Sequence, residues 1–166
     1  MMLHQLDRRF ALALFAIPWV GNNTLRLFVT CGGTTVLISM WVSNTATTAM
    51  MYPIVLGILS AMGDLLSAQT GKAVNLMGTR FATGMMLMIA YGASIGGLGT
   101  PVGSPPNLIG IGMIETMIGK KITFFEWMLL CLPIVLVMFI VLSVLLLRLH
   151  PVPVKTIDGI KERVQP

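Results

Sequence analysis

Ser43-Asn44-Thr45-Ala46-Thr47-Thr48 places six small and mostly polar residues in the middle of a long apolar run. Leu27 to Gly63 contains no Asp, Glu, Lys or Arg over 37 residues. A straight helix of that length would measure roughly 55 Å, nearly twice the thickness of the hydrocarbon core of a bilayer. Hydroxyls and amides are unfavourable against lipid, so these must face protein, water or a ligand. The pattern predicts a helical hairpin over residues 23–63, with arms at Leu25–Trp41 and Ala49–Met62, that enters the membrane and turns back at the polar tip.

A second segment that interrupts helix is Gly96-Gly97-Leu98-Gly99-Thr100-Pro101-Val102-Gly103-Ser104-Pro105-Pro106-Asn107. Its three prolines and four glycines exclude regular helix. The apolar arm before it, Phe81–Ile95, has 15 residues and is too short to cross a bilayer alone. Helix can resume at Leu108 and continue to Ile118. The sequence therefore predicts a discontinuous transmembrane helix over residues 81–119, unwound near the middle of the bilayer.

The composition of the whole chain is that of a membrane protein. Hydrophobic residues make up 55% of the sequence and charged residues 10%, and the mean hydropathy is +0.87. A soluble domain of this length needs more charge to cover its surface. Three runs free of charge exceed the roughly 20 residues that span a bilayer as helix: Leu27–Gly63, Phe81–Ile114 and Trp127–Leu147. We therefore expect an integral, multi-pass protein of the inner or plasma membrane.

The basic residues lie at the ends of the apolar runs rather than along one helix face. Eight of them can share one side of the membrane: Arg8, Arg9, Lys72, Arg80, Arg148, Lys155, Lys161 and Arg163. This positive-inside pattern predicts a cytoplasmic N-terminus, a cytoplasmic loop at 64–80 and a cytoplasmic tail at 150–166, with Lys120-Lys121 outside. Nucleic-acid binding is not expected despite the net charge of +5, because there is no basic stripe with interleaved aromatic residues.

The ends of the sequence carry the remaining elements. Residues 1–22 combine charge with apolar residues and predict an amphipathic helix at the membrane interface. A removable signal peptide is not expected, because no small-x-small cleavage site follows closely. Residues 120–149 are long enough to form a further transmembrane helix, with Glu126 at its start in the interface.

Two polar, helix-breaking elements at membrane depth are the main functional signal. Interrupted helices of transporters direct half-helix N-termini at anionic substrates, while hydroxyls and free carbonyls coordinate sodium. The candidate ligands are neutral oxygens, which suit a hard cation: Ser39, Ser43, Asn44 and Thr45 in the hairpin, and the glycine carbonyls, Thr100, Ser104 and Asn107 in the unwound segment. Packing remains an open alternative at Ser39, because a serine in a membrane helix often bonds the carbonyl of the preceding turn.

Other chemistries find little support in the sequence. No nucleophile lies beside a base, so an enzyme is not expected. His4 and His150 have no Cys, Asp or Glu at metal-ligand spacing. The segment 97–103 does not fit the dinucleotide fingerprint, and no Gly-Lys-Ser/Thr follows it. Cys31 and Cys131 are interpreted as small buried hydrophobic residues.

Two segments, Trp41–Met51 and Ala93–Asn107, closely resemble the Ser-Asn-Thr hairpin and the unwound mid-membrane loop of the divalent anion/sodium symporter family of di- and tricarboxylate carriers. The resemblance extends from about Arg8 to His150. It implies an all-α membrane protein of the elevator type, a homodimer in the full carrier, in which a transport domain moves against a scaffold. It implies sodium ligands at Ser39, Ser43, Asn44 and Gly103. It implies a substrate carboxylate site at Asn44, Thr45, Ser104 and Pro105.

Carriers of this family contain two inverted repeats, each with one hairpin and one broken helix, whereas this sequence holds one of each. We therefore expect one half or a fragment of a carrier, with a second repeat or complementary subunit as its partner. The expected function is sodium-coupled secondary transport of a carboxylate of the succinate, malate, fumarate or citrate class. Three alternatives stay open: a sodium-independent anion exchanger of the same fold, a sulfate carrier of that fold, and a non-transporting membrane fragment or subunit.

Overall fold

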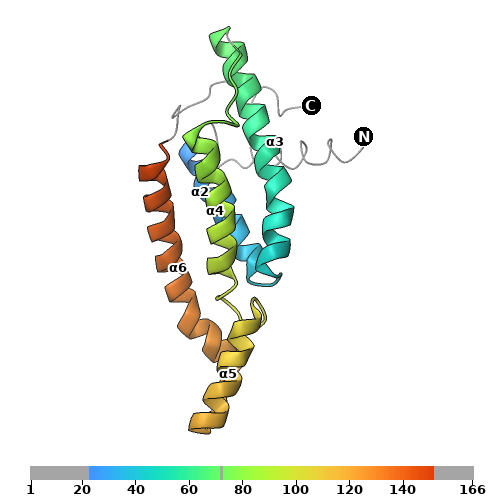
Figure 1. Ribbon diagram of the computed structural model, residues 1–166. Helices are drawn as coiled ribbons and strands as arrows, with labels where there is room; N and C mark the ends of the chain where they lie inside the picture. Colours follow the sequence, from blue (N-terminus) through green and yellow to red (C-terminus); the bar gives the residue numbers. More distant parts are fainter. Residues whose placement is uncertain (1–22, 72, 152–166) are drawn as a thin grey trace.

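The computed structural model describes residues 23–71 and 73–151, and the regular secondary structure of that part of the chain is entirely helical (Figure 1). The expected all-α fold is therefore confirmed for the described residues. The helices are α2 (Thr24–Ser39), α3 (Asn44–Thr70), α4 (Arg80–Gly96), α5 (Pro105–Ile118) and α6 (Phe124–Leu149). The expected interfacial helix at 1–22 and most of the tail expected at 150–166 lie outside the described residues.

Helices α2 and α3 run in opposite directions and are joined by a four-residue turn, 40–43 (Figure 1). Ser43 is the N-cap of α3, and its hydroxyl accepts a hydrogen bond from the Ala46 N–H at 3.4 Å. The polar run that was expected to form the tip is therefore the first turn of α3, and the turn itself lies just before it. The physical reason is that Ser, Asn and Thr side chains satisfy the free N–H groups at a helix start.

The second arm of the hairpin is longer than expected. Helix α3 continues past Met62 to Thr70, so the connecting loop is 71–79 and not 64–80. Gly71 ends the helix in the left-handed conformation, with φ of 66° and its N–H bonded to the Ser67 carbonyl. Asp64 did not stop the helix because its side chain is exposed at the outer end of α3. Polarity alone was a poor guide to the end of this helix.

The broken helix is present, with a shorter interruption than expected. Helix α4 ends at Gly96 and α5 begins at Pro105, which leaves eight residues, 97–104, without helix. Helix resumes at Pro105 rather than at Leu108. Prolines at the first positions of a helix lack only an N–H that would have no partner there, and their fixed φ suits the helix.

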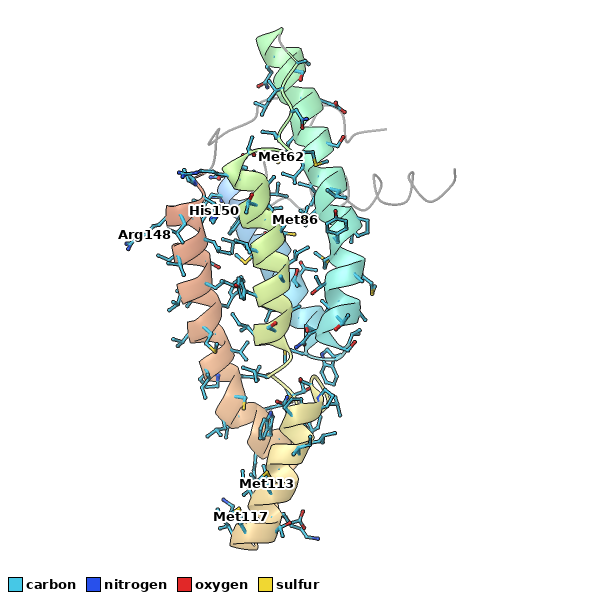
Figure 2. The ribbon with its side chains drawn as sticks, viewed as in Figure 1. Met62, Met86, Met113, Met117, Arg148 and His150 are labelled. Atoms are coloured by element: carbon cyan, nitrogen blue, oxygen red, sulfur yellow. The ribbon has the colours of Figure 1, made fainter. Side chains whose placement is uncertain are left out.

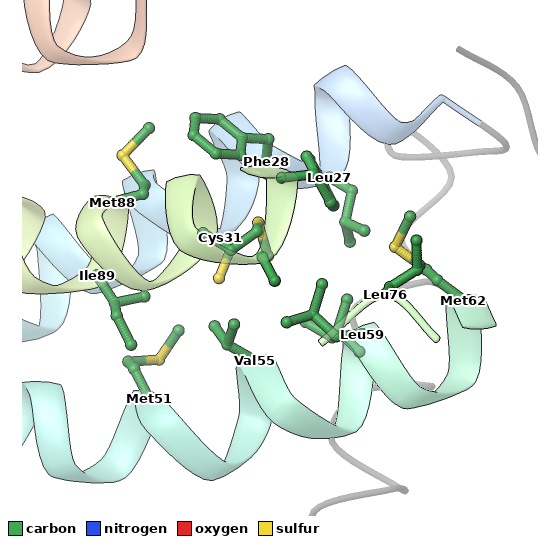
Figure 3. Close-up of a cluster of buried hydrophobic side chains, with 14 of the residues drawn as sticks. Leu27, Phe28, Cys31, Met51, Val55, Leu59, Met62, Leu76, Met88 and Ile89 are labelled. Carbon is green, nitrogen blue, oxygen red and sulfur yellow. The ribbon is translucent and has the colours of Figure 1, made fainter. Parts of the chain in front are cut away.

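Helix α4 lies at the centre of the bundle and packs against α2, α3 and α6 (Figure 1). The core between these helices is apolar and includes the residues labelled in Figure 3: Leu27, Phe28, Cys31, Met51, Val55, Leu59, Met62, Leu76, Met88 and Ile89.

His150, which caps the end of α6, lies so close to Gly84 that a Cβ on this glycine would be 2.8 Å from the His150 Cβ. Helix α5, by contrast, extends away from the bundle, and Asn107 is its buried residue.

Glycines set the close approach of α2 and α4. A Cβ at Gly96 would lie 2.3 Å from the Val36 carbonyl oxygen, which belongs to the backbone of α2. A Cβ at Gly92 would lie 3.6 Å from the Gly32 carbonyl oxygen, an ordinary contact distance. Small residues of this kind let membrane helices approach through their backbones. Gly96 is therefore required by the packing, whereas Gly92 tolerates a methyl group.

Two of the described helices are long and apolar enough to cross a membrane: α3 over Asn44–Gln69 and α6 over Phe124–Leu149. Charged residues collect at the two ends of the molecule. The starts of α2 and α4 and the end of α6 lie at one end, and these carry Arg26, Arg80 and Arg148 (Figures 1 and 2). Lys120 and Lys121 follow α5, which ends at the opposite end.

Replacement of Gly96 by alanine is expected to lower the stability of the purified protein in detergent. The added methyl group meets a backbone oxygen that cannot move without displacing α2, and overpacking of this kind costs about 1–3 kcal/mol. Gly92→Ala is the matched control and should change the melting temperature little. Thermal unfolding of both variants would measure the effect. Equal melting temperatures for Gly96→Ala and the parent would contradict the close approach of α2 and α4.

Cysteines introduced at Gly78 and Lys120 are expected to be labelled from opposite sides of the membrane. Gly78 suits this test because an added side chain meets open space there. Cys31 and Cys131 are first replaced by alanine, and that background serves as the unlabelled control. An impermeant maleimide should reach the Lys120→Cys variant in intact cells and the Gly78→Cys variant only after permeabilisation. Labelling of both variants from the same side would contradict the placement of Gly78 and Lys120 on opposite sides of the membrane.

Candidate functional site

The turn of the hairpin and the break between α4 and α5 meet at one place. The Thr100 hydroxyl donates a hydrogen bond to the Met40 carbonyl in the hairpin turn. The same hydroxyl accepts from the Gly103 N–H at 3.0 Å. Thr100 is fully buried. It therefore links the hairpin to the break and shapes the break at the same time.

Three oxygen atoms converge where the end of α2 faces α4. The hydroxyl oxygen of Ser39 lies 2.8 Å from the side-chain oxygen of Asn44 and 2.6 Å from the carbonyl oxygen of Ala93. Ser39 is fully buried. A serine hydroxyl carries one hydrogen and can donate to one of these two acceptors at a time. The cluster of Ser39, Asn44 and Ala93 is therefore richer in acceptors than in donors.

Asn44 also lies directly against the break. A Cβ at Gly97 would be 2.3 Å from the side-chain oxygen of Asn44. A Cβ at Gly103 would lie 2.6 Å from the Gly97 carbonyl oxygen and 3.1 Å from that of Met40. Any side chain at either glycine would displace the groups that bring the hairpin and the break together. Gly97 and Gly103 are therefore needed for the packing of the site, in addition to allowing an irregular backbone.

Asn107 has a structural role that the sequence did not predict. Its side-chain nitrogen donates to the carbonyls of Gly97 at 2.7 Å and Thr100 at 2.9 Å. The residue is 4% exposed and comes from the first turn of α5. The Asn107 amide group thus connects the non-helical segment 97–104 to α5, the helix that follows it. Asn107 and Thr100 were considered as ligands, but the structure shows both bonded to main-chain carbonyls within the protein.

The expected sodium ligands are brought together only in part. Ser39 and Asn44 are in contact, and Gly103 is buried beside the Met40 carbonyl. Ser43 is exposed, and its hydroxyl caps α3.

The expected substrate residues fall on two elements. Asn44 and Thr45 line a cavity beside the hairpin turn. Ser104 is half-buried and is the N-cap of α5, although its hydroxyl makes no capping hydrogen bond. Pro105 is exposed at the first position of α5. The starts of α3 and α5 thus both carry residues that were expected to bind the carboxylate.

The cavity beside the hairpin turn has a volume of about 660 Å³. Its lining contains no charged side chain and consists of Asn44, Thr45, Thr48, Ala49, Tyr52 and Ser94. Thr48, Tyr52 and Ser94 were not predicted. The spacing of four residues from Asn44 to Thr48 and on to Tyr52 was a signal that these side chains share one face of a helix. Ser94 comes from α4 and could be found only from the packing.

Aromatic residues at the start of α6 contact both elements of the site. The rings of Trp41 and Phe124 are stacked with centroids 6.2 Å apart, and Trp41 belongs to the hairpin turn. The indole nitrogen of Trp127 donates to the Leu98 carbonyl in the break at 3.1 Å. The first turn of α6 is therefore attached to the hairpin and to the break.

The chemistry of this arrangement is that of neutral oxygens and helix starts. Among residues 23–71 and 73–151, no three His, Cys, Asp or Glu side chains come together as a metal site. Uncharged oxygens suit a hard, weakly bound cation. The start of α3 carries free N–H groups and a positive dipole end, which favour an anion. The start of α5 adds a positive dipole end, because Pro105 and Pro106 have no N–H to offer. The site can therefore accommodate a cation and an anion side by side.

Comparisons with known proteins identify the relatives of this chain. Residues 10–162 match a family model described as citrate transporter. The chain is 36% identical over 126 residues to sodium-dependent dicarboxylate transporters named SdcS from Staphylococcus saprophyticus and Staphylococcus aureus, which covers 76% of this chain and 24% of each relative. It is 31% identical over 161 residues to a membrane protein of Cupriavidus necator, which covers 96% of this chain and 29% of that relative.

The chain thus spans about a quarter of the length of these relatives. The family model nevertheless covers most of the sequence, including both interrupted elements. Its match and the dicarboxylate transporters confirm the resemblance to sodium-coupled carboxylate carriers seen in the segments Trp41–Met51 and Ala93–Asn107. The chain therefore belongs to the citrate transporter family.

Proposed function

We propose that this chain forms one half of a membrane carrier that couples sodium to the transport of a di- or tricarboxylate. The observation that carries the proposal is the meeting of the hairpin turn with the break, where Ser39, Asn44 and Ala93 place three oxygens together. The relatives named sodium-dependent dicarboxylate transporters support the same function. Sodium and the carboxylate are both cargo in this proposal.

Sodium would bind at the oxygen cluster. Since the single hydroxyl hydrogen of Ser39 serves one acceptor, the remaining lone pairs of Ser39 and Asn44 are available to a cation. Gly103 would add an oxygen from the break, and Ser43 one from the hairpin. A serine that bonded only the preceding turn would be a packing residue, but the Ser39 hydroxyl instead bonds Ala93 of another helix. This contact between helices favours a functional role for Ser39.

The carboxylate would bind next to sodium, between the helix starts. Asn44 and Thr45 would donate from α3, and Ser104 and Pro105 would lie at the start of α5. Because the cavity has no Lys or Arg, neutralisation of the anion would come from sodium, the N–H groups and the helix dipoles. Binding of the two ions would therefore be mutually dependent.

The second half of the carrier would complete the site. Helix α5 has large apolar side chains that are exposed in the described part of the chain: Leu108, Ile109, Met113, Met117 and Ile118. In the full carrier, lipid and the other repeat would cover them. We propose that the hairpin is re-entrant, that α4 and α5 form the discontinuous transmembrane helix, and that the complete carrier is a multi-pass homodimer of the elevator type in the inner or plasma membrane.

Substrate affinity of the complete carrier is expected to rise with sodium. The reason is that the anion relies on the bound cation for neutralisation. Binding of succinate or citrate to the purified carrier would be measured by calorimetry in sodium and in choline at equal ionic strength. Equal affinities in the two salts would favour the sodium-independent exchanger instead.

Substitutions of three residues are expected to separate the two binding events. Asn44→Asp keeps an oxygen toward sodium but directs a negative charge at the substrate, so uptake should fall at least tenfold. Ser39→Ala should raise the sodium concentration for half-maximal uptake more than the carboxylate KM, and Thr45→Ala should do the reverse. Loss of one charge-assisted hydrogen bond costs about 1.5–3 kcal/mol, which corresponds to about tenfold or more in affinity.

The measurement is the sodium and carboxylate dependence of uptake in proteoliposomes that contain the complete carrier. Thr83→Ala is the control, because this exposed threonine lies in the first turn of α4, away from the break. Uptake by Asn44→Asp at the parental level would show that the start of α3 is only a structural turn.

A further inference from the structure

Thr47 carries a buried hydroxyl that the contacts within the protein leave without a partner. The residue is 0% exposed on α3. Its hydroxyl oxygen has no hydrogen-bond partner among the residues that the structure describes. A buried polar group without a partner lowers the stability of the folded state, and native proteins contain few of them. An ion or a water molecule is a frequent partner of such a group.

The helical backbone does not account for the unpaired hydroxyl of Thr47. Other hydroxyls on the described helices donate to the carbonyl four residues earlier, at distances from 2.7 to 3.2 Å: those of Thr35, Thr48, Ser67, Ser94 and Thr116. The corresponding carbonyl for Thr47 is that of Ser43, which accepts the Thr47 N–H at 2.9 Å. The Thr47 hydroxyl makes no such bond. Its oxygen is therefore free to bind a group that lies between the helices.

Thr47 lies one helical turn from the oxygen cluster at the end of α2. Residues three and four apart share one face of a helix, and Asn44, Thr47 and Met51 follow this spacing along α3. Asn44 belongs to the oxygen cluster, and Met51 packs in the core with Ile89 of α4 (Figure 3). Helices α3 and α4 run in opposite directions, so the residue one turn closer to the hairpin turn than Ile89 is Ala93 (Figure 1). Thr47 is therefore at the level of Ala93.

We propose that Thr47 is a further ligand of the cation at the oxygen cluster, and that its hydroxyl oxygen raises the affinity of this site for sodium. The inference rests on the proposed function, because it takes sodium as the cation. The cluster holds oxygens of Ser39, Asn44 and Ala93, and Thr47 adds a fourth. A hydroxyl oxygen is neutral and suits a hard cation.

This role predicts different effects of Thr47 on stability and on binding. Thr47→Val replaces the hydroxyl by a methyl group of similar size and removes an unpaired polar group from the interior. Without sodium, the variant should therefore be at least as stable as the parent. Sodium should stabilise the variant less than the parent, because a ligand stabilises the folded state according to its affinity. A residue with only a packing role would change the stability equally with and without sodium.

The test measures the melting temperature of the purified complete carrier over a range of sodium concentrations, with choline added to keep the ionic strength constant. Thr47→Val removes the hydroxyl, and Thr47→Ser retains it in a smaller side chain. Thr35→Val is the matched control, because Thr35 is equally buried but its hydroxyl donates to the Cys31 carbonyl at 2.8 Å. Uptake in proteoliposomes then gives the sodium concentration for half-maximal rate.

The sodium concentration for half of the thermal shift should rise about tenfold in Thr47→Val, as expected for the loss of one contact with a charged group. The same increase should appear in the sodium dependence of uptake. Thr47→Ser and Thr35→Val should stay within about twofold of the parent. In choline, Thr47→Val should melt at or above the temperature of the parent.

Two results would overturn this role of Thr47 and leave the proposed function in place. Thr47→Val with the sodium dependence of the parent would assign a water molecule to the hydroxyl instead. Thr47→Val that melts below the parent in choline, or does not fold, would show that the hydroxyl has a partner within the protein. A parent that sodium does not stabilise would overturn the proposed function, and the role of Thr47 with it.

Discussion

Two interruptions of helix lie at the same level of the bundle and impose the main constraint on this structure. They are the hairpin turn at 40–43 and the break at 97–104. Backbone N–H and carbonyl groups that leave a helix need partners, and none come from lipid. The chain supplies those partners itself, because Thr100 bonds the Met40 carbonyl while Asn107 bonds the carbonyls of Gly97 and Thr100. The Thr100 bond joins the two breaks, and the Asn107 bonds stabilise the break between α4 and α5 from within. The oxygens left over at this junction, on Ser39 and Asn44, are the ones that the proposed function assigns to cargo.

The existence of both breaks could be predicted from the sequence, and their boundaries could not. Polar residues within 37 uncharged residues, and a dense group of glycines and prolines, have few other physical explanations at membrane depth. The boundaries depend on capping. Ser43 begins α3 earlier than its polarity indicated, Pro105 begins α5 earlier than its helix propensity indicated, and α3 continues through Asp64 because one side of it is exposed. Propensity describes the interior of a helix and not its ends.

The residues of the candidate site also divide into those that could be predicted from the sequence and those that could not. Ser39, Asn44 and Thr45 could be proposed from the hairpin segment, where sequence neighbours become neighbours in space. Ser94 could not, because only the packing of α3 on α4 brings it to the cavity. Asn107 could be noticed but not assigned, since an asparagine that binds an ion and one that closes a loop have the same side chain. The contacts with Gly97 and Thr100 distinguish the two roles.

Contacts at both ends of α6 fix the position of this helix relative to α4. One end lies against α4 where His150 covers Gly84, and the other is attached just beyond α4, where Trp127 bonds the Leu98 carbonyl and Phe124 stacks on Trp41. Helix α4 cannot slide along α6 without losing contacts at both ends. If the hairpin and the break move across the bilayer as proposed, α6 must move with them, and the proposed sliding surface lies outside this helix.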